Sequence, residues 1–592
     1  MDSIIQENID ELVSEFKKRG ADLTDPVSKL MVTALLHQAQ KIKDEISSLP
    51  GKIVSRLCEY FIPKSKIDAI PALCLLQPAL KAKKGMEAHS IAEGTFFSFK
   101  VDNKTSLTYF PLFRNYILPV TANHILTDKK LIAKGSRIAL DLKCKGKVWV
   151  GLEMPGELET LENVSFLIRG TNGVFPEKIL VGNEMTDISY TPANNLSDIP
   201  MMDPFDSQQA NASSIEVFSN WQRQLAEMAD GRLIYITDPL KDRDIFKYRA
   251  YPKSFQQYLE SNDLDKFENN TLWILFDFGE EYEVPENIEI IPNVVPAVNV
   301  SLNSLTLTQS SPIAKLTKGD GSYFLNLVET SLPAQKQGFN AINEDVVVRD
   351  FDVNCYNKNM LHRDVRNLYN RFIEDYYAFV DYHSLKDGEL IRTLRELVNK
   401  IGKGVVAAND VKNRFDEGTY AMRSVALIGK PVSVKVSYLT THGKLGNSPK
   451  EGMKLENKKD VALEKDVKVI SSATGGEDKA TADQRYEMLR YYSLTCDRLY
   501  TKMDIDAFLR IQLLKEFGKE EVKRISYDIS VQGAGGPTKL VRGLYIDIKF
   551  KDEKNYRKAM SSVLDRKLHQ MIMDKSCISM PIIVTLMNAE SK

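Results

Sequence analysis

The sequence is poor in cysteine, and the cysteines that it has are scattered. Its 592 residues include only six cysteines, and no two of them form a CxxC pair. A disulfide framework or a zinc knuckle needs cysteines at close, regular spacing, so we expect neither. The seven histidines also lack a His or Cys partner at metal-ligating spacing. These absences favour a reducing compartment, and they predict no bound metal and no cofactor.

The chain also lacks an excess of charge and a long hydrophobic run. Its 79 Lys and Arg residues offset 80 Asp and Glu residues, which leaves a net charge of -1. Nucleic-acid-binding proteins usually carry a basic excess, so we expect no nucleic-acid partner. A transmembrane helix needs about 18 or more consecutive apolar residues, and the charged stretch 1–20 lacks the apolar centre of a secretion signal. We therefore expect a cytoplasmic protein.

Catalytic motifs are missing as well. The sequence contains no phosphate-binding GxxxxGK[ST], no HExxH, no GxSxG and no GxGxxG directly after a predicted strand. Gly533, Gly535 and Gly536 lie between two predicted strands, where a hairpin turn is the simplest interpretation. His383 follows an aromatic stretch and could take part in acid-base chemistry, but aromatic helix faces usually pack in a core or against a partner. We predict no catalytic residue and no enzyme activity.

What remains is an ordinary globular composition in a long chain. Hydrophobic residues make up 43% and charged residues 27%, and a single core rarely serves more than about 300 residues. Short runs of β-branched and aromatic residues, separated by Gly, Pro or Asn, indicate sandwich-like or barrel-like domains. The sequence thus predicts an α+β multidomain fold. We expect an N-terminal helical segment (1–70), a first β-rich domain (71–300), a second β-rich or mixed domain (301–480) with an exposed linker near 444–480, and a mixed α/β C-terminal domain (481–592).

Two segments have clear helical signals. In the C-terminal domain, Asp504 can cap a helix that Gly518 ends. In the N-terminal segment, side chains recur near the 3.6-residue period and form a stripe wide enough to need a partner surface. The stripe packs either on the chain's own β-rich domains or in a bundle with another subunit. The candidate interface residues are Leu30, Leu35, Gln38, Ile42 and Ile46.

The order of the segments resembles the TssF family, wedge components of the type VI secretion baseplate. The resembling stretches include YFIPKSKIDAIPALCLLQP, GTFFSF, LFRNYILPVTANHIL, IFKYRAYPKSFQQYLE, IEIIPNVVPAVNVSLNSLTL and VSVKVSYLTTHGKLG. Pro296 and Asn299 stand where the family has them, whereas Val300 replaces an expected Phe. Each stretch is short, but their collinear order spans nearly the whole chain. The chain is therefore identified as a divergent relative of this family.

The resemblance implies a structural protein at work in a large assembly. In the family, two TssF-like copies bind one TssG-like subunit to form a wedge, and wedges surround a VgrG-like spike hub. The wedges also contact TssK-like trimers and a TssE-like sheath initiator, at the inner face of the inner membrane. Such a wedge starts the polymerisation of a contractile tube and sheath. We expect the same partners for this chain, including a second copy of itself, and contact with a membrane only indirectly, through the docking complex.

Two other functions stay open at this point. A wedge protein of a contractile phage-tail-like injection particle shares the architecture and differs in its partners. A carbohydrate-binding multidomain protein is a separate class, because β-sandwiches with exposed aromatic residues often bind sugars. That second alternative would need an export signal, and we see none in the sequence.

Overall fold

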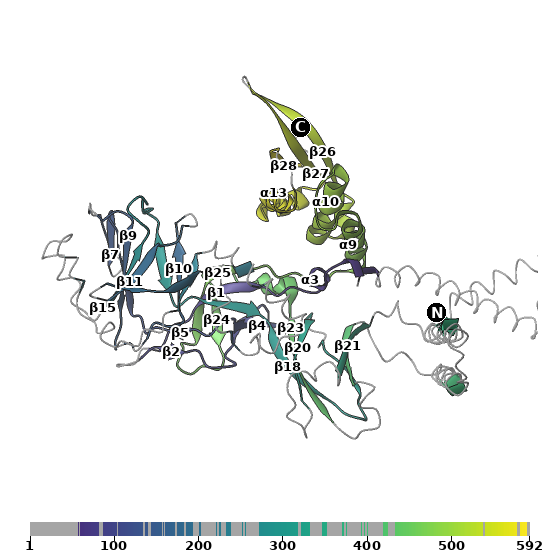
Figure 1. The fold of residues 1–592 in the computed structure, drawn as a ribbon, viewed down its shortest axis with the longest axis horizontal. Helices are drawn as coiled ribbons and strands as arrows, with labels where there is room; N and C mark the ends of the chain where they lie inside the picture. The colour runs from purple at the N-terminus through teal and green to yellow at the C-terminus, as the bar shows by residue number, and fades with distance from the viewer. Residues whose placement is uncertain are drawn as a thin grey trace, which may run out of the picture. The chain divides into compact units, whose positions relative to one another are not determined.

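The structure is a computed structural model. It describes residues 57–81, 87–192, 221–237, 271–331, 346–351, 418–423 and 433–588, with short gaps inside these ranges, and a few positions elsewhere. The chain forms two compact units (Figure 1). Unit 2 comprises residues 68–349 and 419–479, and unit 1 comprises residues 1–67, 350–418 and 480–592. We describe each unit by itself.

The centre of unit 2 is a closed β-barrel. Its strands, in barrel order, are β1 (Leu73–Gln77), β17 (Val295–Asn299), β4 (Ser106–Pro111), β3 (Phe97–Lys100), β24 (Lys454–Asn457) and β25 (Asp466–Thr474). β17 is buried at every position and β1 at all but its last, which explains why both read as continuous apolar runs in the sequence. The barrel therefore joins segments from the beginning, the middle and the end of unit 2.

The prediction of an exposed linker near 444–480 is wrong. In its place the structure has a 3-10 helix, η8 (Gly443–Asn447), followed by β24 and β25. β25 begins with exposed and buried positions in alternation, so its polar residues belong to the solvent face of a barrel strand. The Lys, Glu and Ser residues of this range are therefore abundant because one face of the paired strands is exposed to solvent, and not because the segment is unstructured.

Next to the barrel, unit 2 contains two sheets packed face to face. The seven-stranded sheet has the order β12 (Thr186–Ile188), β11 (Lys178–Val181), β15 (Thr271–Asp277), β9 (Lys147–Glu153), β6 (Ala122–Leu126), β7 (Lys130–Ala133) and β8 (Ser136–Ala139). The four-stranded sheet has the order β13 (Tyr190–Pro192), β14 (Leu233–Ile236), β10 (Val164–Arg169) and β16 (Glu289–Pro292). Val150 and Phe276 from the first sheet share one buried cluster with Phe166 and Ile234 from the second. The two sheets thus form a β-sandwich, as the sequence predicted.

Smaller sheets complete unit 2 and extend to its boundary. One sheet has the order β18 (Ser301–Leu307), β23 (Val434–Thr441) and β20 (Tyr323–Ser331), and another has β19 (Ile313–Lys315), β22 (Gly418–Arg423) and β21 (Val346–Phe351). They share a buried cluster that includes Leu307, Val346 and Val436. A short pair, β2 (His89–Ser90) with β5 (Tyr116–Ile117), lies apart from both.

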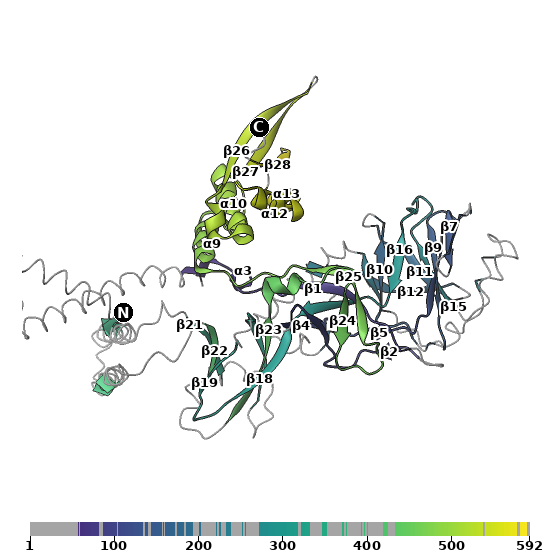
Figure 2. The same cartoon turned by 180° about the vertical axis from the view of Figure 1, so that it is seen from behind.

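The C-terminal part of unit 1 is a three-stranded sheet with helices (Figures 1 and 2). The sheet has the order β26 (Ile525–Gly536), β27 (Lys539–Phe550) and β28 (Ile582–Asn588). The described helices of this part are α9 (Ala482–Thr495), α10 (Lys502–Phe517), α11 (Lys519–Val522), α12 (Glu553–Ser561) and α13 (Leu564–Lys575). The short helix α3 (Lys64–Ile67), from near the beginning of the chain, packs its Ile67 against the same core. Ile546 and Ile582 of the sheet share a buried core with Phe508 of α10 and Leu568 of α13. This helix-and-strand region, together with the β-rich unit 2, confirms the α+β multidomain class.

Local sequence signals explain the ends of α10. Thr501 is its N-cap, and the Thr501 hydroxyl accepts a hydrogen bond from the Asp504 amide while the Asp504 carboxylate accepts one from the Thr501 amide. Asp504 is thus the second partner in a capping box and not the cap itself. Gly518 ends the helix with a φ of 81°, a backbone conformation that glycine adopts at little cost.

The predicted glycine-rich turn is part of a strand. Gly533, Gly535 and Gly536 lie within β26, where they pair with Arg542, Leu540 and Lys539 of β27. The hairpin is therefore longer than predicted, and it reaches beyond the helices in both views (Figures 1 and 2). Glycine is less frequent in strands than in turns, but this is only a statistical preference. A complete antiparallel register with β27 overrides it here.

Candidate functional site

The five predicted interface residues cannot be placed. Leu30, Leu35, Gln38, Ile42 and Ile46 lie outside the described residues, so their role stays a prediction. The same holds for His383. The described residues point instead to three other features: a buried asparagine junction, a fastened loop and a group of exposed apolar side chains.

The asparagine junction is centred on Asn299, the last residue of β17, which is fully buried. Its side-chain amide nitrogen donates to the Thr108 carbonyl of β4 at 3.0 Å. Its side-chain oxygen accepts from the Thr441 hydroxyl at 3.2 Å and from the His442 amide at 3.1 Å. Its own backbone amide donates to the Ala72 carbonyl at 2.7 Å. One side chain therefore connects the barrel to the end of β23.

The turn after β23 is held against this junction. The Tyr109 hydroxyl donates to the Gly446 carbonyl of η8, and burial raises the pKa of this phenol well above its ordinary value, which keeps the donor proton in place. A Cβ at Gly446 would meet the Asn299 side-chain oxygen at 2.7 Å, so only glycine fits. Asn447 and Gly476 exchange two hydrogen bonds of 2.9 Å. The junction thus fixes η8 onto the barrel.

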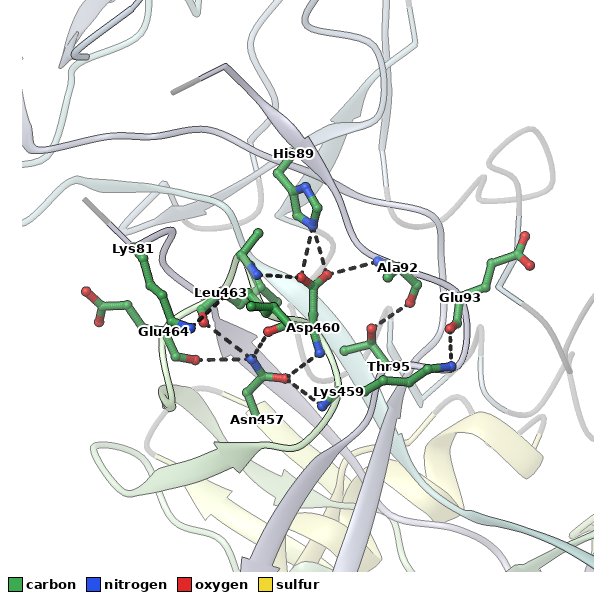
Figure 3. Close-up of polar contacts among 12 residues, drawn as sticks. Lys81, His89, Ala92, Glu93, Thr95, Asn457, Lys459, Asp460, Leu463 and Glu464 are labelled. Carbon is green, nitrogen blue, oxygen red and sulfur yellow. Dashed lines mark hydrogen bonds and ion pairs between the residues drawn. The ribbon is translucent and has the colours of Figure 1, made fainter. Parts of the chain in front are cut away.

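The fastened loop connects β24 to β25 and is centred on Asp460 (Figure 3). Its carboxylate accepts hydrogen bonds from the amides of Ala92 and Ala462, both at 3.0 Å, and lies 2.9 Å from His89 Nε2. Burial alone would raise the pKa of this carboxyl group, but the hydrogen bonds outweigh it, and the pKa lies below its usual range. We call these contacts the Asp460 latch, since they hold the loop against the segment around β2.

Two lysines support the Asp460 latch. Lys81 Nζ donates to the Val461 carbonyl and Lys459 Nζ to the Glu93 carbonyl, both at 2.7 Å (Figure 3). Asn457 accepts from the Asp460 amide at 3.2 Å and donates to its carbonyl at 2.6 Å. The carboxylate is thus fully engaged by donors of its own chain, which suits a structural fastening and leaves it no role as a base.

One further acid-base pair lies on the face of the seven-stranded sheet that points away from the four-stranded sheet, on the side of the Trp149 and Trp273 cluster. His124 Nε2 is 2.9 Å from the Glu153 carboxylate, and the imidazole stacks on Trp273 with ring centroids 6.3 Å apart. The side chain of His124 is only 1% exposed, so no substrate can reach it. Among the described residues, no group of three or more His, Cys, Asp and Glu is arranged to hold a metal ion. None of the described helices is long and apolar enough to cross a membrane.

The exposed apolar side chains lie mainly in unit 1. Its described part exposes large hydrophobic residues on α9, α10, α12, α13, β26 and β28 and in the segments beside them: Leu57, Tyr60, Phe61, Tyr486, Leu494, Tyr500, Met503, Val531, Met560, Val563, Met571, Met573, Ile583 and Met587. The much larger described part of unit 2 exposes Val101, Val174, Leu302, Val347, Leu445, Met453 and Val461. Exposed methionines and aromatics are typical of protein-binding surfaces, because they are large, apolar and adaptable.

Sequence reasoning missed the Asn299 junction and the Asp460 latch. Asn299 interrupts the apolar run VVPAVNV, and a polar residue in a buried strand must find hydrogen-bond partners. This polar residue within an apolar run was the sequence signal that could have indicated the junction. Asp460 stands in a Lys- and Glu-rich stretch, where nothing in the sequence separates a buried carboxylate from its exposed neighbours.

In comparisons with known proteins, the chain is similar only to solved structures. No protein-family model and no curated protein matches the chain. One similar structure is a chain of the TssK-TssF-TssG baseplate subcomplex of the type VI secretion system, with 10% identity, a TM-score of 0.43, and coverage of 95% of this chain and 94% of that chain. A second belongs to the baseplate complex of the type VI secretion system, with 11% identity, a TM-score of 0.36, and coverage of 100% and 98%.

Proposed function

We propose that this chain is a structural subunit of a contractile injection machine, a wedge component of a type VI secretion baseplate. Its role is to bind neighbouring subunits and not to turn over a substrate. The observation that carries the assembly role is the set of large apolar side chains that unit 1 exposes, among them Met503, Tyr500 and Tyr60. Methionine and aromatic residues of this kind are enriched at protein–protein interfaces relative to the rest of a protein surface.

The collinear resemblance to the TssF family supports the choice of machine. Two of the resembling stretches, which contain Asn299 and Thr441, meet through a direct hydrogen bond in the structure. Stretches that are separated in the chain but joined in the fold are good candidates for a shared structural element. The partners that we propose are a smaller TssG-like subunit, a second copy of this chain and a TssK-like trimer.

The two units would have different tasks in such a wedge. Unit 2 supplies a rigid body, because its barrel closes on itself and leaves no free strand edge. The described part of unit 1 supplies surfaces for neighbours. The apolar stripe predicted for residues 30–46 would add helices to a bundle with other subunits.

The test is a tagged purification of the chain from its native cells. Light scattering then gives the mass of the complex, and mass spectrometry identifies its members. We expect one smaller subunit for every two copies of this chain. A chain that elutes as a 67.0 kDa monomer with no partner would contradict the proposal and would redirect the search to ligand and enzyme screens.

Variants in the N-terminal stripe separate assembly from folding. Leu35→Asp and Ile42→Asp place a charge in the predicted interface and should abolish capture of the smaller subunit while the chain stays folded. Lys43→Asp, next to the stripe, is the matched control and should keep the complex. If Leu35→Asp and Ile42→Asp bind as tightly as the unchanged chain, the stripe is not the interface. A phage-tail-like particle is distinguished by the identity of the captured partner.

A further inference from the structure

Within the part of the chain that the structure describes, the outer edge of β28 has no strand partner. β28 is the last strand of its sheet and pairs in parallel with β27 on one side. The Leu544 amide donates to the Pro581 carbonyl at 2.8 Å. Because backbone groups alternate along a strand, the odd-numbered residues of β28 bond to β27, and Ile582, Val584 and Leu586 direct their amides and carbonyls outward.

The sequence of β28 does nothing to protect this edge. Residues 582–588 read IIVTLMN, with no charge, no proline and many β-branched or large apolar side chains. Natural proteins usually protect exposed edges with lysine, proline or a bulge. Ile583 is 40% exposed and Met587 is 36% exposed. Both alternate with Ile582, which belongs to the helix-covered core, so they lie on the opposite face of the sheet.

We propose that β28 pairs in antiparallel fashion with β28 of a second copy of this chain. The two sheets then become one continuous sheet. The register is centred on Thr585, so that Thr585 faces its counterpart and Ile583 faces Met587 on either side. Val584 and Leu586 of opposite copies exchange the hydrogen bonds of their outward backbone groups.

The edge fits a second copy better than a charged or dissimilar partner. An uncharged strand has no charge repulsion against itself, and it offers nothing to attract a strongly charged partner. The register around Thr585 covers all the exposed apolar side chains of the edge at once, because Ile583 and Met587 lie at equal distances from the centre. The inference rests on the proposed function for the presence of two copies in one assembly, and it adds the surface by which they meet.

A pair of short strands alone buries less surface than the roughly 1,000 Å² of a stable interface. We therefore expect a weak dimer of the purified chain that a covalent bond can trap. Two residues in direct opposition at a non-hydrogen-bonded position have Cα atoms about 4.5 Å apart, within disulfide range.

The decisive experiment is oxidation of the full-length Thr585→Cys chain. We expect a disulfide-linked dimer on a non-reducing gel, at least tenfold more than the unchanged chain gives with its native cysteines. Val584→Cys is the matched control, because Val584 faces Leu586 of the other copy and points to the opposite face of the sheet. Equal crosslinking of Thr585→Cys and Val584→Cys would overturn the register, and no crosslinking above the unchanged chain would overturn the pairing.

A second variant tests the edge without cysteine chemistry. Ile583→Lys places a charge on the open edge and should remove the concentration-dependent dimer that sedimentation detects. Val531→Lys is the control, because Val531 is also exposed but lies on β26 at the other edge of the sheet. Circular dichroism confirms that both variants fold.

The outcomes separate this inference from the proposed function. If Ile583→Lys stays bound to the smaller subunit but no longer dimerises, both stand. If the purified chain never dimerises and Ile583→Lys instead loses the smaller subunit, the edge binds a strand of that subunit, and the self-pairing is wrong while the assembly role remains.

Discussion

Unit 2 and the C-terminal part of unit 1 solve the problem of stability differently. Unit 2 buries polar side chains such as Asn299 and Asp460 and gives each of them several hydrogen-bond partners. The C-terminal part relies on helices that pack against a small sheet, two of which, α9 and α10, begin with a capping box. The first arrangement fixes a shape, and the second leaves apolar surface for neighbours.

This difference indicates a division of labour within one chain. A buried polar network penalises every arrangement that breaks it, so it specifies a single geometry. A partly covered apolar layer tolerates several neighbours. The following variants test whether the two regions differ in this way, and the three tryptophans make the test possible, since all of them lie in unit 2. Tryptophan fluorescence therefore reports the unfolding of unit 2 alone.

The largest effect should come from Asn299→Leu. The change removes the acceptor that the Thr441 hydroxyl and the His442 amide share, together with the donor to the Thr108 carbonyl, and we expect a loss of about 3 kcal/mol in the stability of unit 2. Urea unfolding followed by tryptophan fluorescence measures it. Asn303→Leu is the control, since Asn303 is half-buried and makes fewer contacts between segments. Equal losses for the two variants would contradict the special role of the Asn299 junction.

The Asp460 latch should give a smaller effect that depends on pH. Its lowered pKa means that the folded state holds the ionised form more strongly than the unfolded state does. The stabilisation is therefore complete above the ordinary carboxyl pKa and is lost as the pH falls through the lowered value. We expect Asp460→Asn to cost about 2 kcal/mol at pH 7 and the difference from the unchanged chain to shrink steadily below pH 4 in the same fluorescence assay. A difference that stays constant down to pH 2 would show that the charge is irrelevant.

In the C-terminal part, the cap of α10 should contribute less to stability than the Asn299 junction or the Asp460 latch. Thr501→Ala removes the side-chain half of the capping box and should destabilise α10 by about 1 kcal/mol. Hydrogen exchange of the α10 amides, measured by mass spectrometry, detects the change, and tryptophan fluorescence should not respond. Thr501→Ser keeps the hydroxyl and serves as the control. A shift in the tryptophan signal would mean that the two units are energetically coupled.

Val563 offers a gain in stability in place of a loss. It lies between α12 and α13 with a φ of 52°, a left-handed conformation that a β-branched residue rarely adopts. Val563→Gly relieves the strain at the cost of chain entropy, so we expect a net gain of about 0.5 kcal/mol. Slower hydrogen exchange in α13 would show it, while Val563→Ala, which keeps most of the strain, should gain less. Faster exchange in Val563→Gly would indicate that the Val563 side chain itself stabilises the region.

The smallest effect on stability should come from the exposed apolar residues. Met503 is 69% exposed, and Met503→Ser should change stability by less than about 0.5 kcal/mol while it weakens capture of partner subunits. Val461→Ser in unit 2 is the control, because Val461 is also apolar and, at 81%, even more exposed, but lies in the rigid unit. If both substitutions weaken capture alike, the division of labour between the units is wrong.

The sequence predicted those parts of the fold whose signals are local. The apolar run that became β1, the end of α10 at Gly518 and the mixed C-terminal region all follow from neighbouring residues. The prediction of a linker at the barrel strands β24 and β25 is wrong. These strands pair with each other, but their other partners, β3 and β1, are far away in the sequence, and the polar solvent face of the hairpin hides its alternation. The pairing of Asn299 with Thr441 was hidden for the same reason, since 142 positions separate them.

The discontinuity of unit 1 has a consequence for synthesis of the chain. Cys58 and Ile62 belong to the same core as Met488 and Leu513, and the Cys58 thiol contacts the Arg485 carbonyl across 427 positions. At about 5–20 residues per second, a ribosome needs roughly 20–90 s to cover that distance. The apolar side chains of Cys58 and Ile62 therefore stay without their core while unit 2 is translated, and we expect this part of the nascent chain to need protection by a chaperone.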